Sequence, residues 1–385
     1  MTERTRPPDD GDFSGDYQAT EIELTAQPLA KGRGAQINPD NRFLKIHLET
    51  DLEQVEHDEE YLAERRTHKT EYFSDDAKSI LSENNSPDIP FRFSLNPYRG
   101  CAHGCAYCYA RPSHEYLGLS AGIDFESKIF VKQHAAELLR QQLDKPSWQP
   151  QSVMMSGITD CYQPAERQFL ITRKCIEVAA EYHQPLSIIT KNSLVTRDID
   201  LLSEMAKKNL ARVAISVTSL DQSLTRVLEP RSSSPAARLR TVRELSEAGI
   251  PVTVMLAPII PGLNDSEIPA ILEAAKEHGA KHAGYILVRL PLTVRPVFLE
   301  WLERHFPTKR ERIESLIRGT REGQYNQSQF GQRMRGTGDY ADHLINTFRL
   351  FNGRFGLNRQ HPPLDTTQFR RPRPNSGQLT LFDID

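Results

Sequence analysis

Three cysteines in one short run constrain this chain most. Cys101, Cys105 and Cys108 are three of the five cysteines among 385 residues, and their spacing is CxxxCxxC. Three thiolates on one loop can hold three corners of a cubane iron–sulfur cluster. No fourth Cys follows in the run, so the fourth iron would stay open to another ligand. An open iron allows chemistry on a bound molecule, and the run therefore predicts a reactive [4Fe–4S] cluster.

The same cysteines could instead serve in a structural zinc site or in disulfides. A structural zinc ion takes four nitrogen or sulfur ligands, and His103 or the distant Cys161 could complete such a set. A disulfide framework is typical of short secreted chains. This chain is long, has few cysteines and begins without an apolar signal segment, so the cluster is favoured over both alternatives.

Length and charge narrow the class of protein further. The length allows roughly two to three domains, and no apolar stretch approaches the roughly 20 residues of a membrane span. We therefore expect a cytoplasmic protein with no membrane partner. The net charge of −3 conceals an acidic front and a basic rear. Residues 1–90 hold 10 Lys and Arg against 21 Asp and Glu, whereas residues 304–373 hold 14 against 6.

The basic rear places arginines among aromatic residues, as in the run FRLFNGRF at 348–355. Nucleic acid could use such a footprint. A solvated, Arg-rich helical cap explains the same charge equally well.

Between its two ends the chain alternates short β-rich runs with amphipathic helical stretches, which indicates an α/β fold built from βα units. We expect strands at residues 91–96, 153–156, 186–190, 213–217, 252–256 and 285–288. Helices are expected over 132–143, 165–182, 198–208, 235–248 and after Asn264. Residues 1–40 and about 360–377 lack periodicity and are expected to be disordered.

The cysteine run, with an aromatic residue before its last Cys, resembles the radical S-adenosylmethionine (SAM) superfamily. The lead-in NPYRGC at 96–101, TDCYQP at 159–164 and EPR at 229–231 are similar to its bacterial members related to spore photoproduct lyase. The resemblance implies an open (β/α)6 partial TIM barrel at residues 86–292. Flanking it would be an acidic N-terminal extension (1–85), a basic helical segment (293–360) and a disordered tail (361–385).

The same resemblance implies two cofactors, the [4Fe–4S] cluster and SAM, and a low-potential electron donor as partner. Working residues of such barrels gather at the C-terminal ends of the strands. There the resemblance implies that Asp160 meets the amino group of SAM, Lys191 its carboxylate and Ser216 its ribose. Tyr107 would pack on the adenine or the cluster, and Arg231 would lie at the same mouth. The alternatives are a helix cap for Asp160 and surface positions for Lys191 and Ser216.

Tyr109 and Cys161 are candidate radical residues. Spore photoproduct lyase likewise carries two tyrosines next to its third Cys, assigned to radical relay, and Tyr109 matches the second. A Cys near the second strand end serves there as hydrogen-atom donor. Cys161 lies just past the Thr-Asp pair, so packing in the core is its alternative.

The C-terminus carries one more resemblance. Gln378, Leu379, Leu381 and Phe382 resemble the short peptide by which bacterial DNA polymerases and repair proteins dock on the sliding clamp, although a chance apolar tail would look the same. The lyase-like core, the basic segment and this tail together favour a damaged or modified base in DNA as substrate. The alternatives are radical modification of RNA or a peptide, and a clamp- or nucleic-acid-binding protein with a structural or redox-sensing cluster.

Overall fold

The computed structural model describes residues 30–44, 68–359 and 362–372. Its centre is a seven-stranded sheet in the order β10-β9-β8-β7-β6-β3-β2. Six of the strands run parallel, and β2 (Leu81–Glu83) pairs antiparallel with β3 at one edge. The parallel strands are β3 (Phe93–Leu95), β6 (Val153–Met155), β7 (Leu186–Thr190), β8 (Ala211–Ser216), β9 (Val252–Ile259) and β10 (His282–Leu287).

These six strands confirm the predicted open (β/α)6 fold. Within the described residues no strand pairing joins β10 to β2, so the sheet keeps two free edges and the barrel stays open. Each predicted strand overlaps an observed one. The clearest cases are the predominantly apolar strands β7 and β9.

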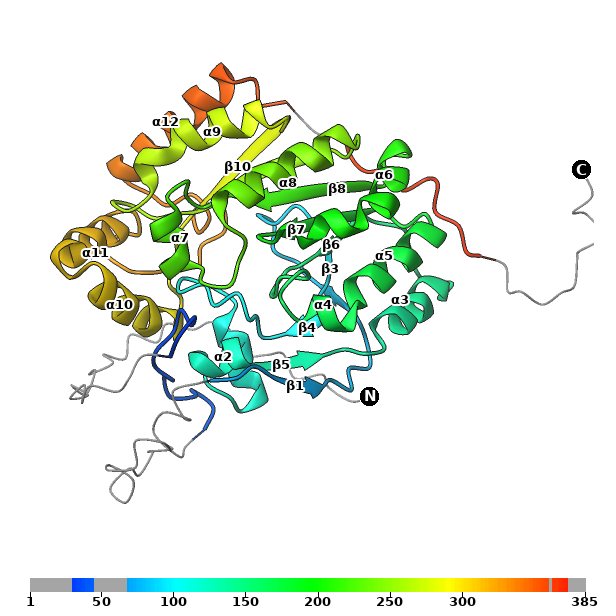
Figure 1. Cartoon of the computed structure of the whole chain (residues 1–385), viewed down its shortest axis with the longest axis horizontal. Coiled ribbons are helices and arrows are strands. Elements are labelled where there is room, and N and C mark those ends of the chain that lie inside the picture. Colours follow the sequence, from blue (N-terminus) through cyan, green and yellow to red (C-terminus); the bar gives the residue numbers. More distant parts are fainter. Residues whose placement is uncertain (1–29, 45–67, 360–361, 373–385) are drawn as a thin grey trace, which may run out of the picture.

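Helices wrap the outside of the sheet, as Figure 1 shows. Helix α6 packs on β8, α8 on β8 and β9, and α9 on β9, while α3 packs on α5. The predicted helix over 165–182 is two helices, because Leu170 between them has a left-handed φ of 54°. The outer helices are α3 (Ala135–Asp144), α4 (Glu166–Phe169), α5 (Ile171–Glu181), α6 (Ile199–Lys207), α7 (Gln222–Leu228), α8 (Pro235–Glu247) and α9 (Ile268–Glu277), with 3-10 turns η2 (Ser193–Asp198) and η3 (Asp265–Glu267).

A second sheet, absent from the sequence prediction, supports the cysteine loop. It has three strands in the order β1-β5-β4, namely β1 (Glu71–Ser74), β5 (Lys128–Val131) and β4 (Tyr98–Arg99). The 3-10 helix η1 (Arg111–Leu117) and α2 (Ile123–Ser127) lie between the cysteines and β5. Strand β4 has only two residues and β1 (EYFS) begins and ends with a polar residue, so neither stands out as an apolar run.

The carboxyl-terminal part adds α10 (Val294–His305), η4 (Pro307–Lys309), α11 (Arg310–Gly319) and α12 (Asp339–Arg354). Helix α12 packs on α9 (Figure 1), and Phe348 of α12 lies 4.6 Å from Tyr285 of β10 between ring centroids. Phe348 is buried in the main core. The aromatic residues of the 348–355 run therefore pack against the core from one face of an amphipathic helix. Residues such as Arg349 and Leu350 lie on its exposed face.

Segments near both termini lie against this body. Residues 362–372 run past the ends of the outer helices, where Asp365 N donates to Asn209 O and Arg370 N to Tyr182 O. Residues 30–44 lie on the cysteine loop, and Ala35 is fully buried. The clamp-like residues 378–382 fall outside the described residues. None of the helices in the described ranges combines the length and the apolar character needed to cross a bilayer.

Candidate functional site

The three cysteines follow β4 on a loop at the carboxyl end of the parallel strands. Cys101 and Cys105 are buried and Cys108 is half-buried, and all three are free thiols. Burial, and after it the neighbouring Cys101, raise the pKa of Cys108 to about 11. Burial likewise raises the pKa of Cys105, with Glu229, Cys108 and Cys101 adding to it. The three thiols thus lie within electrostatic reach of one another.

This donor set fits an iron–sulfur cluster, because such clusters take thiolate ligands from closely spaced cysteines. Among the described residues, no group of three His, Cys, Asp or Glu side chains converges closely enough to hold a single metal ion.

Buried side chains hold the loop in place. Gln163 Oε1 accepts from Ala102 N at 2.9 Å, and its Nε2 donates to Gly100 O at 3.1 Å. Arg111 Nη2 donates to Cys105 O at 2.8 Å. The loop turns at Gly100 and Gly104, whose φ angles of 76° and 67° suit glycine. The loop is therefore shaped by the protein itself.

Asp160 joins the second and third strand ends. Its carboxylate accepts from Thr190 Oγ1 at 2.7 Å and from Lys191 N at 2.8 Å, and it pairs with His103 Nδ1 at 3.4 Å. Burial raises the pKa of Asp160, but His103 and the hydrogen bonds from Lys191 N and Thr190 together outweigh burial and bring it to about 2. Burial lowers the pKa of His103, but Asp160 and Cys101 together outweigh burial and bring it to about 10. Asp160 thus ties the cysteine loop to the strand ends.

Glu229 is a second buried centre of charge at the site. The sequence indicated it only as part of the EPR run at 229–231. Tyr107 Oη and Thr218 Oγ1 both donate to its carboxylate, the latter at 2.7 Å, and Arg238 forms an ion pair with it. Burial raises the pKa of Glu229, but Arg238 and then Lys191 outweigh burial and bring it to about 2. The place of Glu229 directly after Val227 and the buried Leu228 was the available signal.

The predicted residues Tyr107, Lys191 and Ser216 gather around this centre. The Lys191 ammonium lies 5.8 Å from the centroid of the Tyr107 ring and donates to Ala257 O at 3.4 Å. Ser216 ends β8, is buried, and its carbonyl accepts from Arg238 Nη1 at 3.0 Å. The ends of four strands therefore meet beside the cysteine loop.

Arg231 lies with the N-terminal segment. Its Nε donates to Gly32 O and its Nη1 to Thr70 Oγ1, both at 3.1 Å. Its backbone N donates to His103 O at 3.2 Å. These contacts tie residues 30–35 to the loop, and the predicted SAM contact of Arg231 stays a prediction.

The N-terminal segment presses directly on the cysteine loop. Glu126 pairs with Arg111 and accepts from Gly34 N at 3.0 Å and Ala35 N at 2.8 Å. A Cβ on Gly34 would lie 1.8 Å from Gly104 O, which is far inside van der Waals contact. Only glycine allows this approach.

The two candidate radical residues occupy different surroundings. Tyr109 is 49% exposed and its hydroxyl donates to Gly157 O, at the end of β6. Cys161 is fully buried in the main apolar cluster, and burial raises the pKa of its thiol well above the ordinary value. The surroundings of Cys161 favour the packing alternative.

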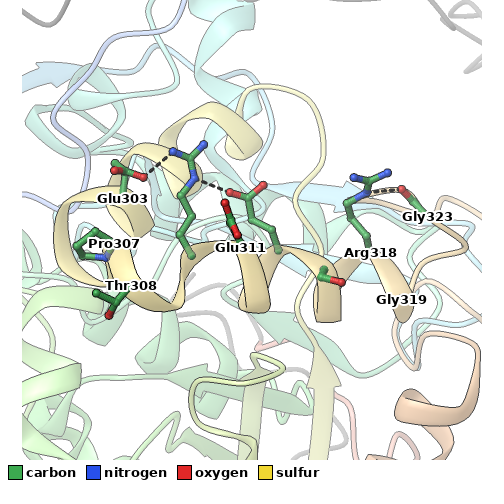
Figure 2. A pocket seen from close by; sticks show the side chains of 10 residues that line it. Glu303, Pro307, Thr308, Glu311, Arg318, Gly319 and Gly323 are labelled. Carbon is green, nitrogen blue, oxygen red and sulfur yellow. Dashed lines mark hydrogen bonds and ion pairs between the residues drawn. The ribbon is translucent and has the colours of Figure 1, made fainter.

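A surface hollow beside α10 and α11 lies on a different part of the chain (Figure 2). Its Arg310 is paired with both Glu303 and Glu314, and Arg318 donates to Gly323 O at 2.8 Å. Arg310 and Arg318 are therefore engaged by the protein's own groups.

Six parallel strands with three thiols after the first, and polar side chains at the ends of the next three, define the class of the protein. The family model described as the Radical SAM superfamily matches residues 95–275, from the end of β3 into α9. The chain belongs to this superfamily.

Two relatives and one solved structure are similar to this chain. The uncharacterized protein Rv2578c of Mycobacterium tuberculosis (strain H37Rv) is 37% identical over 244 residues, which are 63% of this chain and 72% of that protein. The uncharacterized protein MJ0683 of Methanocaldococcus jannaschii is 29% identical over 250 residues, 64% of this chain and 88% of that protein. A variant of spore photoproduct lyase with bound AdoMet and dinucleoside spore photoproduct aligns with a TM-score of 0.55 at 18% identity, over 82% of this chain and 85% of that one. The fold is therefore shared with that lyase.

Proposed function

We propose that this chain is a radical SAM enzyme that acts on a damaged or modified base in DNA. Cys101, Cys105 and Cys108 would hold a [4Fe–4S] cluster, and SAM would bind at the open iron. When bound, the reduced cluster would supply one electron for the cleavage of SAM into methionine and a 5′-deoxyadenosyl radical, and that radical would abstract a hydrogen atom from the substrate. The observation that carries the proposal is the convergence of three thiols with Tyr107, Lys191 and Ser216 at the carboxyl ends of the strands.

The surrounding residues would bind and orient SAM. An ammonium has three donors, and Lys191 uses one in a long hydrogen bond to Ala257 O, so the others can meet the SAM carboxylate. Ser216 lies at the end of β8, and its hydroxyl would meet a ribose hydroxyl of SAM. The Asp160 carboxylate is already engaged by four groups of the protein, two on each oxygen, so a contact to the SAM amino group would have to replace or share one of them.

A DNA lesion is the substrate that the likeness in fold favours, since the similar lyase structure holds a dinucleoside photoproduct. A low-potential electron donor would be needed as a partner. Binding of residues 378–382 to the sliding clamp stays a proposal from the sequence. RNA or peptide modification by the same radical is the alternative.

The test is anaerobic reconstitution with iron and sulfide, followed by absorbance spectroscopy and an assay for 5′-deoxyadenosine after addition of a reductant. Cys105→Ala should lose both the brown absorbance and the product. Cys175→Ala removes a buried thiol of α5, outside the loop, and should keep both. A cluster and product retained after replacement of each loop cysteine in turn would contradict the proposal.

A further inference from the structure

The open seam of the barrel is crossed by two contacts. Tyr109, on the loop after β3, meets Arg289, which lies two residues beyond β10, although β10 and β3 stand near opposite edges of the sheet. Asp88, between β2 and β3, pairs with Arg333 at 2.6 Å. Leu287 N donates to Met334 O at 2.9 Å, so the Arg333 segment lies against the end of β10. Both contacts therefore lie at the seam, next to the cysteine loop.

Positive charge is in excess at this seam. Arg321 is fully buried and donates to the carbonyls of Leu287, Val288 and Arg333. Burial and the nearby Arg289 lower the pKa of Arg321 to about 10. Among the described residues, Asp88 is the carboxylate that acts on Arg289, and Asp88 is itself held by two hydrogen bonds from Arg333. Confining cations with too few counter-charges is costly, and an anionic ligand would relieve that cost.

Arg289 is the arginine at the seam left without a polar partner. In the described parts of the chain its guanidinium makes no hydrogen bond or ion pair, and its Cζ lies 5.1 Å from the Tyr109 centroid. The pKa of Arg289 is lowered, mainly by burial and also by Arg333, although Tyr109 and Asp88 act in the opposite direction. A guanidinium presents a planar fork of donors that matches a phosphate.

Two exposed rings flank these arginines. Tyr109 is 49% exposed under Arg289, and Phe330 is 54% exposed with the Arg333 Cζ 4.9 Å from its centroid. Exposed rings beside guanidinium groups are the platforms on which unpaired nucleobases stack.

We propose that Arg289 binds a phosphodiester of a single nucleic-acid strand at the seam, and that Tyr109 and Phe330 offer ring faces to its bases. This inference rests on the proposed function, because it describes how a nucleic-acid substrate would reach the cysteine loop. Its physical content is a binding site, which can be measured without cluster chemistry.

The test is fluorescence anisotropy of a labelled single-stranded deoxyoligonucleotide with the full, cluster-loaded chain, in the absence of SAM and reductant. Arg289→Ala should weaken binding about tenfold and reduce the salt slope by about one, because one phosphate contact is lost. Arg289→Gln keeps most of the packing over Tyr109 and should weaken binding similarly. Arg240→Ala is the matched control, since Arg240 is an exposed arginine on the outer helix α8.

Unchanged affinity in whichever Arg289 variant keeps the wild-type circular dichroism would overturn the inference. A ribo-oligonucleotide bound through Arg289 would support it equally, since the phosphodiester is shared. A peptide bound in preference to both strands would overturn it. Wild-type protein that binds DNA through Arg289 yet forms no 5′-deoxyadenosine in the separate assay would refute the proposed function and leave this inference standing.

Discussion

Arg289 and Tyr109 bring opposite sides of the open sheet into contact, with the guanidinium carbon 5.1 Å from the ring centroid. Arg289 follows the last parallel strand, and Tyr109 directly follows the third cysteine of the loop. The residue next to Cys108 is thereby held by a side chain that lies 180 residues further along the sequence. The same contact lies where a substrate would approach the open side of the barrel.

Gly34→Ala should damage the cysteine loop. The added Cβ would lie 1.8 Å from Gly104 O, so either residues 30–35 or the loop must shift. We expect a loss of about 1–3 kcal/mol in the free energy of unfolding, as for other overpacked sites, and a lower iron content after reconstitution. Gly319→Ala is the control, because a Cβ there meets open space. Equal iron content in the two variants would show that the N-terminal segment does not support the loop.

Glu229→Gln should destabilise the protein strongly. The change leaves the Arg238 charge buried without its partner, and broken buried pairs cost about 3–5 kcal/mol. Glu244→Gln breaks an exposed pair with Arg240 at 3.7 Å and should cost under about 1 kcal/mol. Denaturant unfolding measures both. A similar small cost for the two variants would mean that Glu229 is not paired as described.

Lowering the pH should remove part of the stabilisation that the buried pair of Glu229 and Arg238 provides. The pKa of Glu229 is about 2 in the folded chain, below the usual value for glutamate, so the folded state binds fewer protons than the unfolded state. Its contribution is complete above the ordinary pKa and is lost as the pH falls toward 2. The loss of unfolding free energy between about pH 6 and about pH 4 should therefore be smaller in Glu229→Gln than in wild type. Identical losses would exclude Glu229 as a contributor.

Lys191→Ala and Ser216→Ala should each weaken SAM binding and leave the cluster in place. Each removes polar contacts worth about 1–3 kcal/mol, which is about 5- to 150-fold in affinity. Equilibrium dialysis with reconstituted protein gives the affinity, and absorbance gives the cluster content. Lys207→Ala, at an exposed pair with Glu204, is the control. Wild-type affinity in both variants would remove these residues from the SAM site.

A peptide spanning residues 375–385 should bind the bacterial sliding clamp with micromolar affinity. Leu379, Leu381 and Phe382 offer apolar area, and Gln378 offers amide hydrogen bonds. The double change Leu381→Ala with Phe382→Ala should abolish binding to the purified clamp, measured by calorimetry. Equal binding of the double variant would refute the clamp resemblance.

The sequence alone determined what depends on neighbouring residues. The spacing of Cys101, Cys105 and Cys108 needs only eight consecutive positions, and each long strand is one apolar run. The apolar runs were enough to predict the strands, because secondary structure follows short-range periodicity. The superfamily and the open barrel were predicted from the resemblance that the cysteine run and its neighbouring motifs carry. The two-residue β4 and the break at Leu170 escaped prediction, since neither leaves a periodic pattern.

Tertiary structure decided which charged and polar groups meet. Tyr107 and Glu229 stand 122 residues apart, and nothing local in either segment announces their hydrogen bond. The same holds for Gly34 against Gly104 and for Arg289 against Tyr109. Counting charges predicted a basic C-terminal part of the chain. Only the fold shows that Arg333 is paired with Asp88 and that Arg321 donates its hydrogen bonds to backbone carbonyls. Composition counts charges, whereas burial and pairing decide which of them remain available to a ligand.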